Sequence, residues 1–201
     1  FTIEAWIALS AYPFEWAPIL QQADWGDAGF YFGISKDGNP GIHVMIGDKW
    51  RSLVFSEKIE LFNWYYLTAT YSIPKKSIQL FVNGEKAGSM KLPEEEFIRH
   101  SSEVTIGLNR QKMPDIIGRM GRGKYPSLIG LEGLIDEVKV SSNVLTEKEI
   151  AEIFDQNQNS NEEYPKAALT NKTLPKIPTE NRFRANYTHL SLYPTWDNLW
   201  R

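Results

Sequence analysis

Residues 64–71 are WYYLTATY and residues 78–82 are IQLFV, followed directly by Asn83-Gly84. In the first run apolar side chains alternate with threonines, and the second run also alternates, so each predicts a strand with one apolar face. Asn-Gly is strong hairpin chemistry. The two strands are neighbours along the chain, and we expect them to share one core face, made of Leu67, Ala69, Tyr71, Ile78, Leu80 and Val82.

The same alternation continues on both sides of this pair. Asp37-Gly38 predicts a hairpin turn within residues 36–40. We expect strands over residues 1–9, 19–22, 30–35, 41–46, 50–55, 63–72, 77–82, 103–107 and 131–140. A strand about every 10 residues favours an antiparallel sandwich or barrel over βαβ units.

Composition narrows the class of protein. The 201 residues carry 22 Lys+Arg and 25 Asp+Glu, and 22 − 25 gives a net charge of −3, too small to favour nucleic acid as a partner. Cysteine is absent, which excludes disulfides and thiolate metal sites. No apolar run approaches membrane-spanning length. The first residue is Phe1, within an expected strand, so we interpret the sequence as a fragment or processed chain, and any signal peptide lies outside it.

The C-terminal quarter predicts one helix and then a change of organisation. Thr146 and Glu149 have capping-box spacing, and Ile150, Ile153 and Phe154 form an apolar face behind them. Residues 156–181 are polar and contain three prolines, as in an extended linker. Residues 182–201 are aromatic again, and we expect them to begin a second domain.

Five segments, in this order, resemble the laminin-G-like jelly roll of the concanavalin A-like lectin/glucanase superfamily. They are residues 1–7 (FTIEAWI), 64–71 (WYYLTATY), 78–84 (IQLFVNG), 104–107 (VTIG) and 133–140 (GLIDEVKV) with 145–150 (LTEKEI) after it. The resemblance implies an all-β sandwich of two antiparallel sheets over residues 1–155, with one short C-terminal helix. It also implies one or two strands before Phe1, so we expect an open sheet edge there that a neighbouring domain or chain completes.

A basic loop is the clearest candidate site. Residues 110–124 hold five cations and one acid, a local net of 5 − 1 = +4 in an acidic chain. Guanidinium groups bind carboxylates and sulfates through paired hydrogen bonds, and aromatic rings offer flat surfaces to sugars. The candidate ligand-binding residues are Arg110, Lys112, Arg119, Arg122, Lys124, Tyr125, Trp25 and Trp50. A solvated loop, or one docked on a neighbouring domain, is the alternative.

A structural calcium ion is the one cofactor that the sequence suggests. Asp24 and Asp27 flank a Trp-Gly pair and offer two oxygens to a hard cation. The resemblance implies a further ligand at Asp136, where the wider superfamily often holds calcium. Residues 108–112 (LNRQK) lack the acids with which pentraxins hold paired calcium ions, which argues against that mode of recognition.

The residues that could support catalysis form only weak motifs. The consecutive acids at 94–96 point to alternate faces of a strand, so they do not form the acid and nucleophile of a glycosidase. His43, beside the basic loop, could imitate the base of a lyase that acts on uronates, although a histidine on a sheet face is the simpler interpretation.

Three hypotheses for function follow. The first is a non-catalytic carbohydrate-binding or interaction module of a larger protein that acts on polysaccharides and is secreted, periplasmic or on the cell surface. The second is part of a glycoside hydrolase or polysaccharide lyase acting on an acidic polysaccharide, with catalysis mainly in a following domain. The third is a purely structural module that packs against a neighbour. We expect a glycan partner, anionic in character, and neither nucleic acid nor a membrane span.

Overall fold

The computed structural model describes residues 1–13, 16–24, 28–93, 104–109 and 129–160, and two antiparallel five-stranded sheets account for most of them. The β1 sheet has the strand order β12 (Gly133–Ser141), β1 (Thr2–Leu9), β6 (Trp64–Ser72), β7 (Ser77–Val82) and β8 (Glu85–Lys91). The β3 sheet has the order β5 (Lys49–Val54), β4 (Pro40–Ile46), β3 (Ala28–Ile34), β2 (Ala17–Asp24) and β9 (Thr105–Ile106). A two-stranded ribbon joins β10 (Leu108–Asn109) to β11 (Ile129–Gly130).

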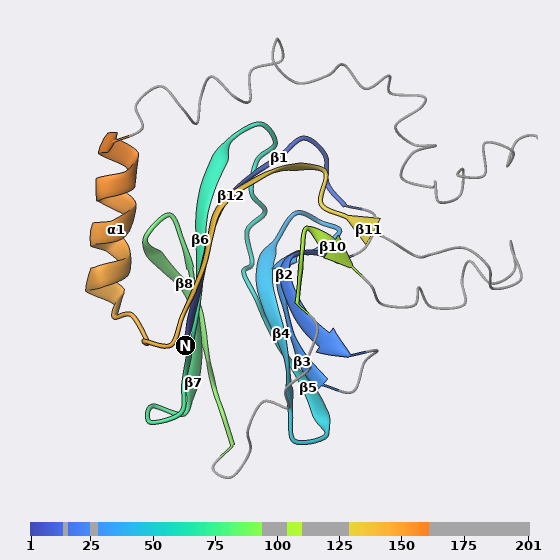
Figure 1. Cartoon of the computed structure of the whole chain (residues 1–201), viewed down its shortest axis with the longest axis vertical. Coiled ribbons are helices and arrows are strands. Elements are labelled where there is room, and N and C mark those ends of the chain that lie inside the picture. Colours follow the sequence, from blue (N-terminus) through green and yellow to red (C-terminus); the bar gives the residue numbers. More distant parts are fainter. Residues whose placement is uncertain (14–15, 25–27, 94–103, 110–128, 161–201) are drawn as a thin grey trace, which may run out of the picture.

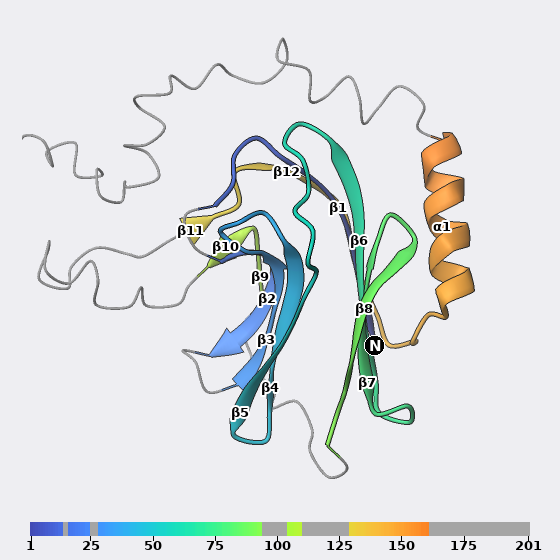
Figure 2. The ribbon, with the colours of Figure 1, turned by 180° about the vertical axis from the view of Figure 1, so that it is seen from behind.

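The sheets pack face to face, and Figures 1 and 2 show the two layers edge-on with the helix outside the β1 sheet. This arrangement confirms the predicted all-β sandwich with one short helix. The predicted register of the central pair is also confirmed, because Leu67 pairs with Val82 and Ala69 with Leu80. The β1 residues that face the core, Ile3, Ala5, Ile7 and Leu9, are fully buried between the sheets.

The turn between β7 and β8 is the hairpin that Asn83-Gly84 predicts. Both residues have left-handed backbones, with φ of 51° at Asn83 and 79° at Gly84, as the tight turn between twisted strands requires. A β-carbon on Gly84 would lie 3.2 Å from the Cβ of Phe154, so the turn also needs glycine to let the helix approach. The turn therefore fixes where the helix lies on the sheet.

Helix α1 (Glu147–Ser160) begins at the predicted capping box. The Glu149 backbone N–H donates to Thr146 Oγ1 at 3.2 Å, and the Thr146 N–H donates to the Glu149 carboxylate at 2.7 Å. The helix continues through Ser160, into the range predicted as linker. Its last turns contain glutamine and asparagine but no glycine or proline, the residues that would end a helix. Residues 161–201 lie outside the described residues.

Helix α1 covers the outer face of the β1 sheet. Trp6, Tyr66 and Phe81 on that face are buried with Ile150 of the helix, and the rings of Trp6 and Phe154 have centroids 5.8 Å apart. A polar pair lies within this layer: the Tyr66 hydroxyl donates to the Glu4 carboxylate. Burial first, and this hydrogen bond second, raise the pKa of Tyr66. Strand β1, in the interior of this sheet, is thus buried on both of its faces.

The prediction of an open edge beside Phe1 is wrong. Strand β1 pairs with β12 on one side and with β6 on the other, so it is interior to its sheet. The C-terminal strand β12 occupies the edge, which could not be inferred from the order of segments along the chain. A β-bulge in β12 interrupts its pairing with β1 between Glu4 and Trp6. Glu137 lies at this bulge and has a φ of 48°.

In the part of the chain that the structure describes, we find no helix long and apolar enough to cross a membrane.

Two isoleucines close in sequence provide a matched test of the core. Ile78 is fully buried and Ile73 is 54% exposed. Replacing Ile78 by alanine removes three buried carbon atoms from the core and should lower the free energy of unfolding by about 2–5 kcal/mol. The same truncation at Ile73 should have little effect, because water already covers most of that side chain. Urea unfolding measures both variants, and equal losses would contradict the packing described here.

Candidate functional site

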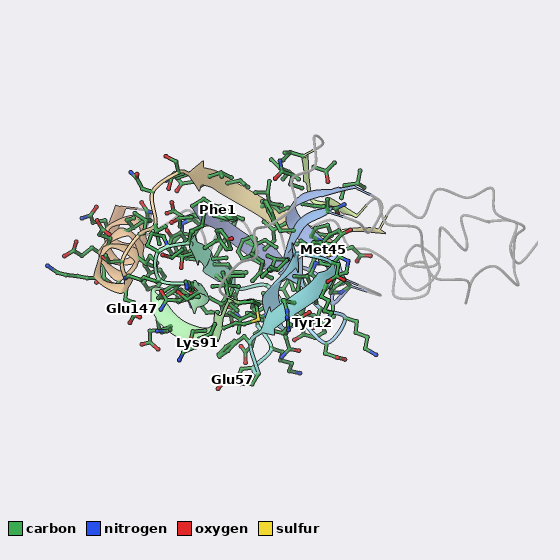
Figure 3. The ribbon with its side chains drawn as sticks, turned by 90° about the horizontal axis from the view of Figure 1, so that it is seen from below. Phe1, Tyr12, Met45, Glu57, Lys91 and Glu147 are labelled. Carbon is green, nitrogen blue, oxygen red and sulfur yellow. The ribbon has the colours of Figure 1, made fainter. Side chains whose placement is uncertain are left out.

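The outer face of the β3 sheet is the face that helix α1 leaves uncovered. Met45 of β4 lies on that face, on the side of the molecule opposite the helix (Figure 3). The inner face of the same sheet is apolar and belongs to the core, with Phe32, Ile42 and Val44 buried there. Alternation along each strand therefore places the residues between these on the outer face.

A row of hydrogen-bonding side chains crosses this outer face from edge to edge. Register pairs Thr105 with Gln21, Gln21 with Tyr31, Tyr31 with His43, and His43 with Ser52. The row therefore takes one residue from each of β9, β2, β3, β4 and β5. Side chains directly opposite one another on neighbouring strands are within contact range, so the row forms one continuous polar strip.

Aromatic rings lie beside this polar row. The Tyr31 and Trp50 rings have centroids 5.0 Å apart and are tilted by 41°. Trp50 pairs with Met45, and it is partly exposed, whereas Tyr31 is 3% exposed. Trp16, which precedes β2, meets the imidazole of His43 edge-on with centroids 4.2 Å apart. The face thus presents partly exposed rings next to polar groups.

His43 lies between Tyr31 and Ser52 in the row. Its Nδ1 lies 2.6 Å from Ser52 Oγ, a short hydrogen bond between two groups that can each donate or accept. Burial lowers the pKa of His43 below its ordinary value, because the charged imidazolium loses solvation beneath Trp16. The imidazole is therefore neutral at neutral pH.

Gln21 contributes an acceptor to the row. Its side chain is 3% exposed, and its Oε1 has no hydrogen-bond donor among the residues that the structure describes. A buried amide oxygen without a donor costs free energy, so such groups normally have a partner in water or ligand.

Charged groups stay off this face within the described strands. Lys49 and Arg51 of β5 pair with Ile46 and Val44, so they point toward the inner side of the sheet. The row and its aromatic neighbours are uncharged when His43 is neutral. The arrangement suits a polar, uncharged ligand with flat apolar surfaces.

The structure places only some of the predicted site residues. Trp50 lies on the outer face as described. Eight of the predicted site residues lie outside the described residues: Trp25, Asp27, Arg110, Lys112, Arg119, Arg122, Lys124 and Tyr125. Asp24 ends β2, and its side chain is also outside the description.

Asp136 faces a structural partner. Its Oδ1 accepts a hydrogen bond of 2.8 Å from the Glu137 backbone N–H, at the bulge of β12. Across the described ranges there is no group of three or more side chains of the types that ligate metals. Calcium binding at Asp136, Asp24 and Asp27 remains a prediction.

Sequence reasoning singled out Trp50 and weighed His43, but it missed Gln21, Tyr31, Ser52 and Trp16. One signal could have found part of the row. The Asp37-Gly38 turn, once its length is fixed, sets Tyr31 opposite His43, as observed. The contribution of Ser52 and Gln21 depends on two further registers that no turn residue specifies.

A family model described as the concanavalin A-like lectin/glucanases superfamily matches residues 1–151. No curated protein sequence matches the chain. The three solved structures described next are 20% identical to the chain or less, so their likeness to it concerns the fold.

One of these structures is botulinum neurotoxin type C, whose cell entry depends on interaction with two ganglioside molecules (20% identity, TM-score 0.57, covering 77% of this chain and 35% of that chain). Another is the CBM40 of the Ruminococcus gnavus IT-sialidase bound to α2,3-sialyllactose (15% identity, TM-score 0.58, covering 76% of this chain and 81% of that chain). A third is domain 4 of AbnA, a GH43 extracellular arabinanase from Geobacillus stearothermophilus, in complex with arabinotriose (15% identity, TM-score 0.56, covering 76% of this chain and 65% of that chain). The chain spans about a third of the toxin chain.

The lowered pKa of His43 makes stability depend on pH. Because the unfolded chain binds the proton more tightly than the folded protein, stability is full above about pH 6.5 and falls as pH drops toward the folded pKa. His43→Gln should remove this part of the slope. Urea midpoints measured from about pH 7.5 to about pH 5 test it, with Ser52→Ala, which keeps the imidazole, as the control. An unchanged slope in His43→Gln would refute the assignment.

Proposed function

Because the chain belongs to the concanavalin A-like lectin/glucanase superfamily, we propose that it is a carbohydrate-binding module whose ligand lies on the outer face of the β3 sheet. The observation that carries the proposal is the Tyr31–Trp50 ring pair beside the polar row, on the face that helix α1 does not cover. The jelly roll here serves as a rigid support for that face.

The chemistry of the face fits a sugar ring. The C–H surface of a pyranose or furanose packs on an aromatic ring, and its hydroxyl groups exchange hydrogen bonds with polar side chains nearby. Trp50 offers the partly exposed ring, and His43 and Ser52 offer hydrogen-bonding groups two residues along the same face. The complexes of the CBM40 with sialyllactose and of AbnA domain 4 with arabinotriose support a glycan ligand for this fold.

Further parts of the proposal rest on sequence alone. The five cations of residues 110–124 would add an anionic specificity, as for uronate or sulfate groups. We propose that the parent protein is extracellular and acts on polysaccharides, as the arabinanase that contains AbnA domain 4 does. A calcium ion held by Asp136 would be a structural addition to this module.

One observation favours a second candidate, a lyase acting on uronates. Tyr31 and His43 are cross-strand partners, and both residue types serve as bases in proton abstraction. The cation that must neutralise the uronate carboxylate is not among the described residues of this face, so it would come from residues 110–124. Ultraviolet absorbance of an unsaturated product, released from an acidic polysaccharide, would identify this activity.

Trp50 tests the binding face directly. Trp50→Ala should reduce affinity for bound saccharides by about 5-fold to about 140-fold, because a stacked ring contributes on the order of 1–3 kcal/mol. Calorimetry with arabinotriose, cellotriose, maltotriose and α2,3-sialyllactose measures it. Phe62→Ala removes another partly exposed aromatic side chain, in the loop between β5 and β6, and should bind normally. Equal affinity in Trp50→Ala, or no binding of any saccharide, would favour the domain-packing alternative.

The basic loop has its own test. If residues 110–124 hold an anionic group, the affinity for sialyllactose should fall as salt shortens the Debye length from about 10 to about 3 Å. Replacing both Arg119 and Arg122 by alanine should remove most of that affinity, and Lys at both positions should restore part of it, because ammonium cannot make the paired hydrogen bonds. Neutral saccharides serve as the control, and a salt-independent affinity for sialyllactose would reject the loop as an anion site.

A further inference from the structure

Beyond general glycan binding, we infer that the outer face of the β3 sheet seats an uncharged saccharide unit, that the His43–Ser52 pair reads its hydroxyl groups, and that protonation of His43 releases it. The inference rests on the proposed function and names the chemistry and regulation of the same face. It draws on the register of five strands, the contacts of His43 and the absence of charge on the face.

The face favours an uncharged unit because its described strands offer no charged side chain to pair with a charged ligand. In the described parts of β2, β3, β4, β5 and β9, the outward positions hold Gln, Tyr, His, Met, Trp, Ser and Thr among their polar or large side chains. A carboxylate or sulfate seated on these strands would lose its solvation without gaining a cation from them, which is costly, so an acidic group would have to lie beside the sheet, toward residues 110–124, and not on it. A hydroxyl group would gain partners instead.

The His43–Ser52 pair can satisfy a hydroxyl in either orientation. A neutral imidazole has one N–H donor and one acceptor nitrogen, and the Ser52 hydroxyl can donate to Nδ1 or accept from it. Nε2 is therefore an acceptor in one arrangement and a donor in the other. Sugar hydroxyl groups also donate and accept, so the pair matches them without a fixed polarity.

Protonation removes this adaptability and adds an uncompensated charge. Both imidazole nitrogens become donors, so Nε2 can no longer accept. The groups that face His43 are Tyr31 from β3, Ser52 from β5 and Trp16 from the loop before β2, and Tyr31 is the one titratable group among them. Glu15 lies outside the described residues. No described carboxylate is placed to hold the imidazolium.

Proton binding to His43 and saccharide binding are thermodynamically linked, and this linkage determines whether affinity rises or falls with pH. A saccharide that covers His43 removes more water from it, so the bound protein takes up the proton less readily than the free protein does. Affinity must fall as the pH falls through the titration range of the free protein, which burial places below about 6.5. One proton limits the loss to about tenfold for each pH unit.

Calorimetry of the full chain from about pH 7.5 to about pH 4.5 tests the inference, with arabinotriose, cellotriose and maltotriose as neutral probes and α2,3-sialyllactose as the acidic probe. We expect a neutral saccharide to bind more weakly as pH falls, by up to about tenfold per pH unit. His43→Gln should bind with an affinity that does not change over this range, whereas Ser52→Ala should keep the pH dependence. The imidazole resonances of His43 should titrate at lower pH when the saccharide is present.

The outcomes separate the two levels of the proposal. Trp50-dependent binding of a neutral saccharide with a constant affinity across this pH range would overturn the inference and leave the proposed function standing. Acid weakening that persists in His43→Gln, or tighter binding at acid pH, would also overturn it. No binding of any saccharide at any pH would overturn the proposed function, and the inference with it.

Discussion

Strand β1 is buried along its whole length and on both of its faces, and this double burial determines which surface of the molecule can meet a ligand. On one side Ile3 and Ile7 pack into the core between the sheets. On the other side the strand presents Thr2, Glu4 and Trp6 to a second layer, formed by helix α1 and the segment before it. A strand with two buried faces requires partners for every polar group it carries.

Those partners tie the C-terminal segment to the sheet. Thr2 Oγ1 donates to the Asn143 carbonyl at 2.7 Å and accepts from the Leu145 N–H at 3.0 Å. Glu4 accepts from Tyr66 beneath the helix. The glycine at position 84 also lets Phe154 approach the turn closely, which gives the helix a further contact with this sheet. Helix α1 covers the outer face of the β1 sheet, and the outer face of the β3 sheet is free of the helix.

On the β3 sheet, register takes over as the determining constraint. The row from Thr105 to Ser52 exists because four strand pairs are in step, and a slip of one residue would bury His43 and expose Val44. Close backbone contact helps to hold that register: a β-carbon on Gly33 would lie 2.2 Å from the Ala17 carbonyl oxygen. Strands β2 and β3 therefore approach more closely there than any other residue would permit.

Local patterns in the sequence were sufficient for strands, turns and the helix start. Period-two alternation located β6 and β7, and the spacing of Thr146 and Glu149 located the capping box, because both depend on contacts within a few residues. The position of β1 inside its sheet was mispredicted, since it depends on pairing with β12 more than a hundred residues away. The candidate site has the same limitation: Trp50 was identifiable as an aromatic residue, but its approach to Tyr31 crosses an intervening strand.

The bulge in β12 has a consequence for how copies of this protein behave together. An edge strand with a regular ladder of free backbone groups is a template on which another strand can grow. At Glu137 the backbone turns left-handed, its N–H is taken by Asp136, and Lys139 lies 3.6 Å from the Glu137 carboxylate on the same strand. An incoming strand would meet a break in the ladder and a pair of charges to desolvate. The β12 edge is thereby guarded against pairing with a strand of another molecule, and the bulge that shapes this strand also keeps its sheet from extending past it.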